Sequence, residues 1–283
     1  VMKCERLKIF NDNDMIKLYF QQQLNSSSTK GKGGLNNYFN IVKMNQKTFS
    51  KLHPSTGNKK MALLLSCGSF NPITILHTRI FEDSKNYLMK ETNKFDIIGG
   101  LLSPVHDHYA KTTLIDSKHR IEMCELALKD SDWISTSNWE VKQKTWTPTK
   151  NVIKAHYKYI KQMKLYDDDV KILFLCGGDI LVKMCESDVW RESDIEEIIS
   201  YGGLAVVERR GTDLQMLVEH SKLLSKYKDH IHIIPQRIDN NVSSSIVREL
   251  IYKHYSAKYL VNNDVLNYIH QNKLYYPNHV TVK

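Results

Sequence analysis

Continuous apolar runs alternate with segments of helical periodicity over residues 61–283. The first run, MALLLSC at residues 61–67, is followed by a glycine. A run of this kind is typical of a strand buried on both faces of a parallel sheet. Residues 77–90 then space several larger side chains three or four positions apart, which predicts a helix.

The same alternation continues to the end of the chain. It predicts strands at 95–102, 133–137, 170–176, 204–208 and 232–235. It predicts helices at 117–129, 149–164, between 179 and 200, and at 213–226, 244–255 and 263–272. Strands that alternate with helices form βαβ units, so we expect an α/β fold, a doubly wound parallel sheet of Rossmann-like type with a helical C-terminal part. Ligands bind at the carboxyl ends of the strands in such sheets, so functional residues are expected directly after strands.

Residues 1–60 differ from the rest of the chain in charge. They contain eleven Lys and Arg against three acidic residues, which leaves 29 positive and 28 negative groups for the remaining 223 residues. The segment 26–34, SSSTKGKGG, has the composition of a flexible linker. We therefore predict a partly flexible basic extension at 1–60 and a nearly neutral catalytic domain at 61–283, which makes nucleic acid an unlikely partner.

Five scattered cysteines, an odd number without a CxxC pair, indicate reduced thiols rather than a disulfide framework or a zinc site. This favours an intracellular protein of the nucleus or cytoplasm. No apolar stretch approaches the roughly 18 residues that cross a bilayer, so no membrane span is expected.

The first candidate site is GSFNPITILH at residues 68–77, between the first strand and its helix. Gly68 lets the backbone approach a ligand closely, and the N–H groups at a helix start favour a phosphate. Thr74 and His77 stand at this start, where an imidazole can neutralise charge on a phosphoryl oxygen. A histidine in this place is more often structural, so the segment alone leaves both interpretations open.

The second candidate site, NNVSSSIVR at residues 240–248, also follows a strand and opens a helix. Serine hydroxyls here can cap the helix, which by itself explains one of them. With backbone N–H groups they also form an anion cradle, and the guanidinium of Arg248, about one turn further on, suits a terminal phosphate. Alone, this second motif is weak evidence for a phosphate site; paired with the first motif, it is stronger evidence.

Together the two motifs resemble the nucleotidyltransferase α/β-phosphodiesterase superfamily, whose phosphate motifs read (H/T)xxH and ISSTxxR. GSFNPITxxH in particular is similar to the eukaryotic nicotinamide mononucleotide adenylyltransferases. The resemblance covers about residues 61–275. Further matching segments are SPV at 103–105, WE at 139–140, Trp146, LCGGD at 175–179, Trp190 and KYLV at 258–261.

The resemblance implies transfer of the adenylyl group of ATP to nicotinamide or nicotinate mononucleotide, forming NAD or deamido-NAD and pyrophosphate. It implies catalytic roles for His77, Lys111 and Arg248. It implies ATP contacts from Gly68, Ser69, Phe70, His77, Gly177, Asp179, Asn240, Ser243, Ser244 and Arg248. It implies mononucleotide contacts from Ser69, Lys111, Trp146, Thr149, Val189 and Trp190.

The residue chemistry agrees with these roles without requiring them. A tryptophan is most often part of a core, but an indole face is a good partner for a flat cationic nicotinamide ring. Asp179 follows a buried strand and two glycines, where it can accept sugar hydroxyl protons; capping a helix is an equally good interpretation.

Two departures from the family pattern stand out. Ser245 replaces the usual threonine and keeps its hydroxyl, whereas Lys111 is flanked by Ala110 and Thr112 in place of further lysines. The acidic run at 167–169 is interpreted as a surface turn, and no metal site is predicted within the protein. Mg²⁺ is expected as a cofactor held chiefly by the phosphates of ATP.

The implied mechanism is a direct in-line attack that needs charge screening and positioning rather than a strong base. Two alternatives remain. The chain could be an adenylyltransferase of the same superfamily with another substrate, or a chaperone-like binding protein with a degenerate site. The paired tryptophans argue against another substrate. The intact His77, Lys111 and Arg248 argue against a degenerate site. The expected partners are ATP and the mononucleotide, and a homo-oligomer is expected.

Overall fold

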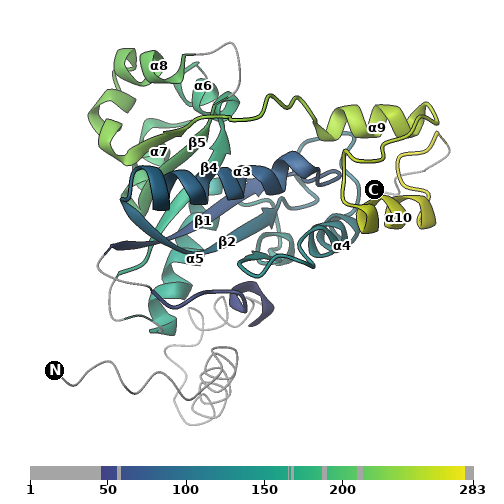
Figure 1. Cartoon of the computed structure of the whole chain (residues 1–283), viewed down its shortest axis with the longest axis horizontal. Coiled ribbons are helices and arrows are strands. Elements are labelled where there is room, and N and C mark those ends of the chain that lie inside the picture. The colour runs from purple at the N-terminus through teal and green to yellow at the C-terminus, as the bar shows by residue number, and fades with distance from the viewer. Residues whose placement is uncertain are drawn as a thin grey trace, which may run out of the picture.

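In the computed structural model, which describes residues 46–55, 59–164, 166, 169–186, 190–208 and 213–277, six strands form one parallel sheet (Figure 1). Their spatial order is β3-β2-β1-β4-β5-β6. The strands are β1 (Lys60–Gly68), β2 (Phe95–Pro104), β3 (Ile134–Thr136), β4 (Lys171–Gly177), β5 (Gly202–Val207) and β6 (Ile231–Ile234). The chain builds the sheet outward from β1 through β2 to β3, then returns to place β4 on the other side of β1 and continues to β6. This is the doubly wound arrangement expected from the sequence.

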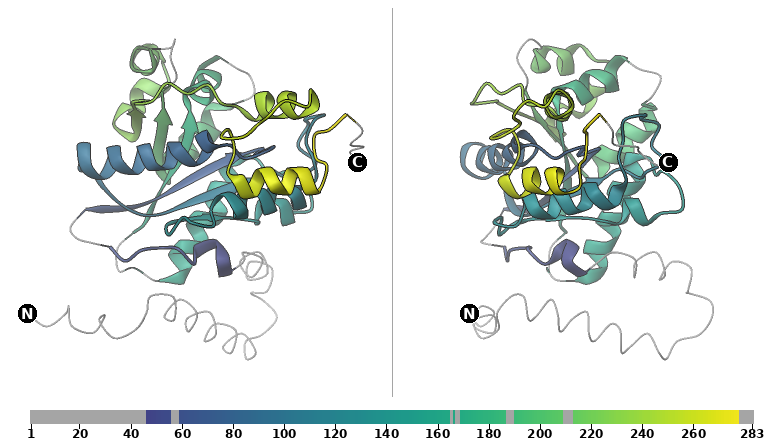
Figure 2. Two further views of the ribbon diagram at one scale, coloured as in Figure 1. Left: turned by 45° about the vertical axis from the view of Figure 1, so that its right-hand side comes forward. Right: turned by 90° about the vertical axis from the view of Figure 1, so that its right-hand side faces the viewer.

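Helices cover both faces of this sheet (Figures 1 and 2). One face packs against α3 (Ile75–Asn86) with its continuation η3 (Tyr87–Glu91), α4 (Ser117–Ala127), α9 (Ser244–Tyr252) and α10 (Asn263–Gln271). The other face packs against α5 (Thr149–Met163), α6 (Gly178–Glu186), α7 (Glu192–Ser200) and α8 (Leu214–His220). Shorter turns are η2 (Gln46–Phe49), η4 (Glu140–Lys142) and η5 (Leu224–His230).

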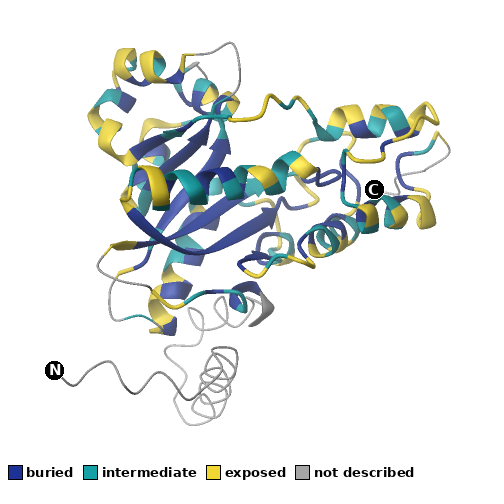
Figure 3. Ribbon diagram, viewed as in Figure 1, coloured by how far each residue is buried: buried dark blue, intermediate teal, exposed yellow. Residues whose placement is uncertain are grey.

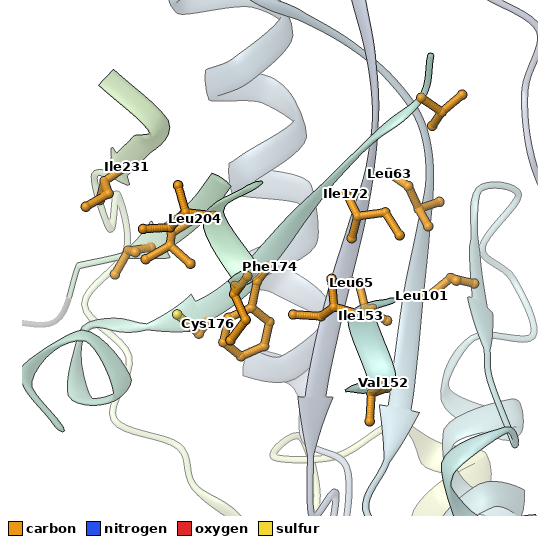
Figure 4. Packing of buried hydrophobic residues seen from close by; sticks show 14 of the residues in the cluster. Leu63, Leu65, Leu101, Val152, Ile153, Ile172, Phe174, Cys176, Leu204 and Ile231 are labelled. Atoms are coloured by element: carbon orange, nitrogen blue, oxygen red, sulfur yellow. The ribbon is translucent and has the colours of Figure 1, made fainter. Parts of the chain in front are cut away.

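Strand β1 shows why its sequence is apolar throughout. Leu63 and Leu65 point to the face of α5 and α7, whereas Ala62 and Leu64 point to the face of α3, and all four are fully buried. Figure 4 shows Leu63 and Leu65 in the cluster on the face of α5 and α7. The strands are accordingly the most buried part of the molecule, and the outer faces of the helices are exposed (Figure 3).

The predicted strands and most predicted helices are confirmed, but a single helix over 213–226 is wrong. The structure ends α8 at His220 and starts the separate turn η5 at Leu224. Ser221 takes an extended backbone, and its hydroxyl accepts the N–H of Leu224 at 3.2 Å. A serine that bonds to the backbone locally competes with helix continuation, which explains the break.

The packed body begins before residue 61. Phe49 and Leu52 are buried in the cluster that contains Leu63, and Phe49 stacks on Tyr159 of α5 at 5.1 Å between ring centroids. The N–H of His53 donates to the carbonyl of Ile98 at 2.8 Å. The segment that we assigned to the basic extension therefore contributes to the core at its end.

Phe49→Ala is expected to lower the free energy of unfolding by about 3–5 kcal/mol, since a large buried aromatic is lost and a cavity remains. Chemical denaturation measures this. The exposed Tyr255→Ala is the control and should change stability by less than about 0.5 kcal/mol. An unchanged midpoint for Phe49→Ala would mean that this segment does not pack on the domain.

Among the described residues, no helix combines the length and the apolar character needed to span a membrane. Cys67, Cys124 and Cys176 are free thiols.

Candidate active site

The loop between β1 and α3 lies at the carboxyl edge of the sheet. Gly68 ends β1, and a Cβ atom added there would lie 3.1 Å from the ring of Phe70. Phe70 is buried and has a positive φ of 44°, which turns the chain sharply toward α3. A Cβ atom at position 68 would thus be in tight contact with the ring, and the backbone of 68–70 is held in place by packing.

His77 is oriented by the start of its own helix. Its Nδ1 atom accepts the backbone N–H of Thr74 at 3.0 Å, and the Thr74 side chain accepts the backbone N–H of His77, which together form a capping box. Nδ1 also lies 2.8 Å from the Thr74 hydroxyl. A ring nitrogen that accepts a backbone N–H carries no proton, so the neutral imidazole has its proton on Nε2. The edge of Phe70 packs against the ring at 5.3 Å between centroids. The structure thus prepares Nε2–H as a donor.

The second motif packs directly on this loop. The Ser244 hydroxyl donates to the carbonyl of Pro72 at 2.8 Å, and Nη1 of Arg248 donates to the carbonyl of Asn71 at 2.8 Å. Ser243 caps α9 by accepting the N–H of Ile246. The starts of α3 and α9, more than 160 residues apart in sequence, therefore lie side by side.

Arg120 of α4 joins this loop to the one that carries Lys111. Its side chain is fully buried and donates to four oxygens. These are the carbonyls of Ser69 at 3.1 Å, Val105 at 2.7 Å and Ile115 at 2.9 Å, and Oδ1 of Asp107 at 2.7 Å. The sequence analysis missed Arg120, because a basic residue in a helix is usually exposed and nothing local marks this one as buried.

Lys111 lies half-buried in a positively charged region. Burial holds the pKa of its ammonium below the usual value, and the charges of Arg248, Arg120 and Lys183 lower this pKa further. Burial also lowers the pKa of Arg248. Cations that repel one another in this way indicate a site that binds an anion. Lys183 of α6 was also missed.

His106, in the loop that carries Lys111, has a structural role. Nδ1 of His106 accepts the N–H of His108 at 3.0 Å, so its Nε2–H donates to the carbonyl of Gln143 at 3.1 Å.

Gly177 and Asp179 lie where β4 passes into α6. Gly177 ends the strand and α6 begins at Gly178, where an added Cβ would come within 2.9 Å of Leu214. Asp179 is exposed in the first turn of α6, where the helix dipole favours a carboxylate. It is inside the helix rather than at its N-cap, two residues after the end of β4.

The two tryptophans stand just before two helices. Trp146 is 44% exposed and its ring lies 6.1 Å from that of Tyr109, in the loop that carries Lys111. Trp190 is half-buried, packs against the core and precedes α7. Thr149 is the first residue of α5. Val189 lies outside the described residues.

Asn240 is oriented toward its own loop, where Oδ1 accepts the N–H of Val242 at 2.9 Å. It also lines a cavity of about 480 Å³ that runs along α3 and includes Ile75 and Leu76 at the helix start. The other predicted site residues do not line this cavity. Asn240 thus lies at the start of the second motif and beside this cavity.

Within the described ranges, there is no group of three His, Cys, Asp or Glu side chains that could hold a metal ion. In the acidic run, Asp169 pairs with Lys171 at 2.7 Å on the surface, and its two neighbours lie outside the description.

A further buried group, Glu140, lies behind the site and was not assigned a role from the sequence. Its Oε2 accepts the hydroxyl of Ser103, at the carboxyl end of β2, at 3.2 Å. Burial raises the pKa of its carboxyl to about 8. The unfolded chain ionises this group near pH 4.5, so folding is favoured at low pH and this contribution is lost as the pH rises through 8.

Glu140→Gln is therefore expected to gain stability relative to the native chain by about 1.4 kcal/mol per pH unit between roughly pH 4.5 and 8. Urea unfolding at several pH values measures the difference. Parallel stability curves for the two proteins would show that Glu140 is ionised in the folded state.

Comparison with known proteins agrees with this geometry. The model of the cytidylyltransferase-like family matches residues 65–250. The chain is 34% identical to nicotinamide/nicotinic acid mononucleotide adenylyltransferase 1 of Bos taurus, covering 77% of this chain and 89% of that protein. It is 31% identical to the Arabidopsis thaliana enzyme of this name, covering 78% and 92%.

The match to the Saccharomyces cerevisiae enzyme is 37% identical and spans 77% of this chain but only 56% of that protein. A Plasmodium falciparum nicotinic acid mononucleotide adenylyltransferase complexed with NaAD has the same fold, with a TM-score of 0.51, 18% identity and coverage of 76% and 97%. The chain thus belongs to the cytidylyltransferase-like family and, within it, to the nicotinamide/nicotinic acid mononucleotide adenylyltransferases.

Proposed function

We propose that this chain transfers the adenylyl group of ATP to nicotinamide or nicotinic acid mononucleotide, forming the dinucleotide and pyrophosphate. One observation carries the proposal: α9 packs by Ser244 and Arg248 on the loop that orients His77. Two helix starts, and a half-buried lysine whose ammonium interacts with the charge of Arg248, then bring N–H groups and positive charge into one region. A triphosphate and a phosphomonoester that must react with each other require such an environment.

In the proposed reaction, a phosphate oxygen of the mononucleotide attacks the α-phosphorus of ATP. The new P–O bond forms as the bond from this phosphorus to the bridging oxygen of pyrophosphate breaks, and pyrophosphate leaves with the electron pair. The nucleophile is already ionised at neutral pH, so no protein base is needed. The enzyme lowers the barrier by positioning both phosphates and stabilising the charge that develops on them.

We assign the residues accordingly. His77 Nε2–H donates to the α-phosphate, Ser243, Ser244 and Arg248 bind the β- and γ-phosphates, and Lys111 binds the phosphate of the mononucleotide. The backbone of Gly68, Ser69 and Phe70 lines the nucleotide, and Gly177, Asp179 and Asn240 contact ATP. Trp146 and Trp190 stack on the nicotinamide ring, while Thr149 and Val189 bind its amide.

Mg²⁺ keeps much of its hydration shell and binds through one or two carboxylates together with substrate phosphates. We propose that it enters with the triphosphate, whose charge it neutralises. Asp179 at the carboxyl end of β4 is the described carboxylate that fits this neighbourhood.

The test is formation of NAD or deamido-NAD from ATP and each mononucleotide by the purified chain. Pyrophosphate must appear in equal amount, which a binding protein would not produce. Pyrophosphate released only with another phosphorylated acceptor would favour a different adenylyltransferase, and no turnover with any acceptor would favour a binding protein.

Trp146→Ala is expected to raise KM for nicotinamide mononucleotide by roughly tenfold and to change KM for ATP much less, since a lost cation–π contact costs about 0.5–2 kcal/mol. Trp146 is largely exposed, so thermal stability should remain near that of the native chain. Trp133→Ala is the matched control: this indole is buried, and its loss should lower the melting temperature. A joint rise of both KM values in Trp146→Ala would contradict the stacking role.

A further inference from the structure

Helices α5 and α7 pack side by side, and both lead away from the carboxyl edge of the sheet. Each precedes one of two neighbouring parallel strands, β4 and β5, so the two helices run in the same direction. Their first turns therefore lie next to each other at the site. Trp146 comes just before α5, and Trp190 comes just before α7.

Paired side chains join the two helices at regular intervals. Nζ of Lys150 lies 2.6 Å from Oδ1 of Asp194. About one turn further on, Nζ of Lys154 lies 2.8 Å from Oε1 of Glu197. A further turn on, the ring of Tyr157 lies 5.0 Å from that of Tyr201, whose hydroxyl donates to Glu197 at 3.0 Å.

The two tryptophans precede this series along the chain, each outside its helix. Trp146 lies four positions before Lys150, and Trp190 lies four positions before Asp194. Neither Trp146 nor Trp190 is inside its helix, so the backbone hydrogen bonds of the helix do not hold either residue. The pair Lys150–Asp194 is the inter-helix contact nearest to both of them in sequence.

The placement of Lys150 is unusual for a helix start. A cation in the first turn opposes the helix dipole, whereas Asp194 in the first turn of α7 is favoured by it. The hydrogen bond to Asp194 raises the pKa of the Lys150 ammonium. Both side chains are only about one quarter exposed. Asp194 thus compensates a charge that α5 alone would not favour.

We propose that Lys150 and Asp194 are positioning residues that hold Trp146 and Trp190 at the separation required to enclose the nicotinamide ring. The inference rests on the proposed function. It adds that the width of the nicotinamide slot is set by an ion pair outside it, on the surface between two helices. Neither residue needs to touch the substrate.

Lys150→Ala is expected to raise KM for nicotinamide mononucleotide by about two- to fivefold and to leave kcat and KM for ATP nearly unchanged. Asp194→Lys should raise this KM more, because it places a third cation beside Lys150 and Lys154. The double variant Lys150→Asp with Asp194→Lys restores an ion pair and should return KM to within about twofold of the native value. Lys171→Ala, which removes an ion pair at the opposite edge of the sheet, is the matched control and should change no kinetic constant.

A double-mutant cycle with Trp146→Ala shows whether the ion pair acts through the indole. In that background, Lys150→Ala should raise KM by a smaller factor than in the native chain, because only Trp190 is left to position. An additive rise, an unchanged KM in Lys150→Ala, or a charge-swapped variant that does not recover would overturn the positioning role. Absence of dinucleotide formation by the native chain would instead overturn the proposed function, so the two failures are distinguishable.

Discussion

Replacing His77 by alanine is expected to lower kcat by about 10²–10³-fold, the usual effect of removing one preorganised donor to a developing oxyanion. The expectation rests on the capping box, which leaves the proton of the neutral ring on Nε2 and fixes the ring plane before substrate binds. KM for both substrates should change much less than kcat. Steady-state kinetics with each substrate varied in turn measures the three constants.

The same variant loses a helix cap, so stability must be measured beside activity. His77→Glu separates the two effects, because a glutamate at this position of a capping box can still accept the N–H of Thr74. Its charge suits the helix start but repels phosphate. We expect a melting temperature at or above that of the native chain and activity at or below that of His77→Ala. Near-native kcat in either variant would exclude His77 from the chemistry.

Replacing Arg120 by methionine is expected to lower the free energy of unfolding by about 3–5 kcal/mol, because three backbone carbonyls lose their donor at once. Methionine fills much of the space but leaves the carbonyls of Ser69, Val105 and Ile115 without the donors they have now. Denaturant unfolding gives the value. Activity should fall as well, because the loops that carry Phe70 and Lys111 lose their common support.

Asp107→Asn provides the control. It removes the charge partner of Arg120 but keeps an oxygen acceptor, and Asp107 is already 42% exposed. We expect a loss of stability below about 1 kcal/mol. If the two variants were equally stable, the guanidinium would not be the link between the loops.

The amino-acid sequence by itself determined the elements and the two motifs. MALLLSC predicts a strand buried on both faces, because a short run of six apolar residues and one serine, followed directly by a glycine, is typical of such a strand. A glycine, a proline and a histidine follow that strand, and three serines stand at the start of α9. Their roles in the two motifs are interpreted from local backbone chemistry. These properties need no partner from elsewhere in the chain, so they can be read residue by residue.

Only the tertiary structure decided how these pieces act together. The contact of Ser244 with Pro72, the burial of Arg120 and the packing of Phe49 each join segments that are far apart in sequence. The type of a polar or basic residue determines what its side chain can bind, but not which carbonyl becomes its hydrogen-bond partner. The alignment of α5 with α7 is set by such contacts, because hydrogen-bond partners between distant segments are selected by the folded geometry rather than by the local sequence.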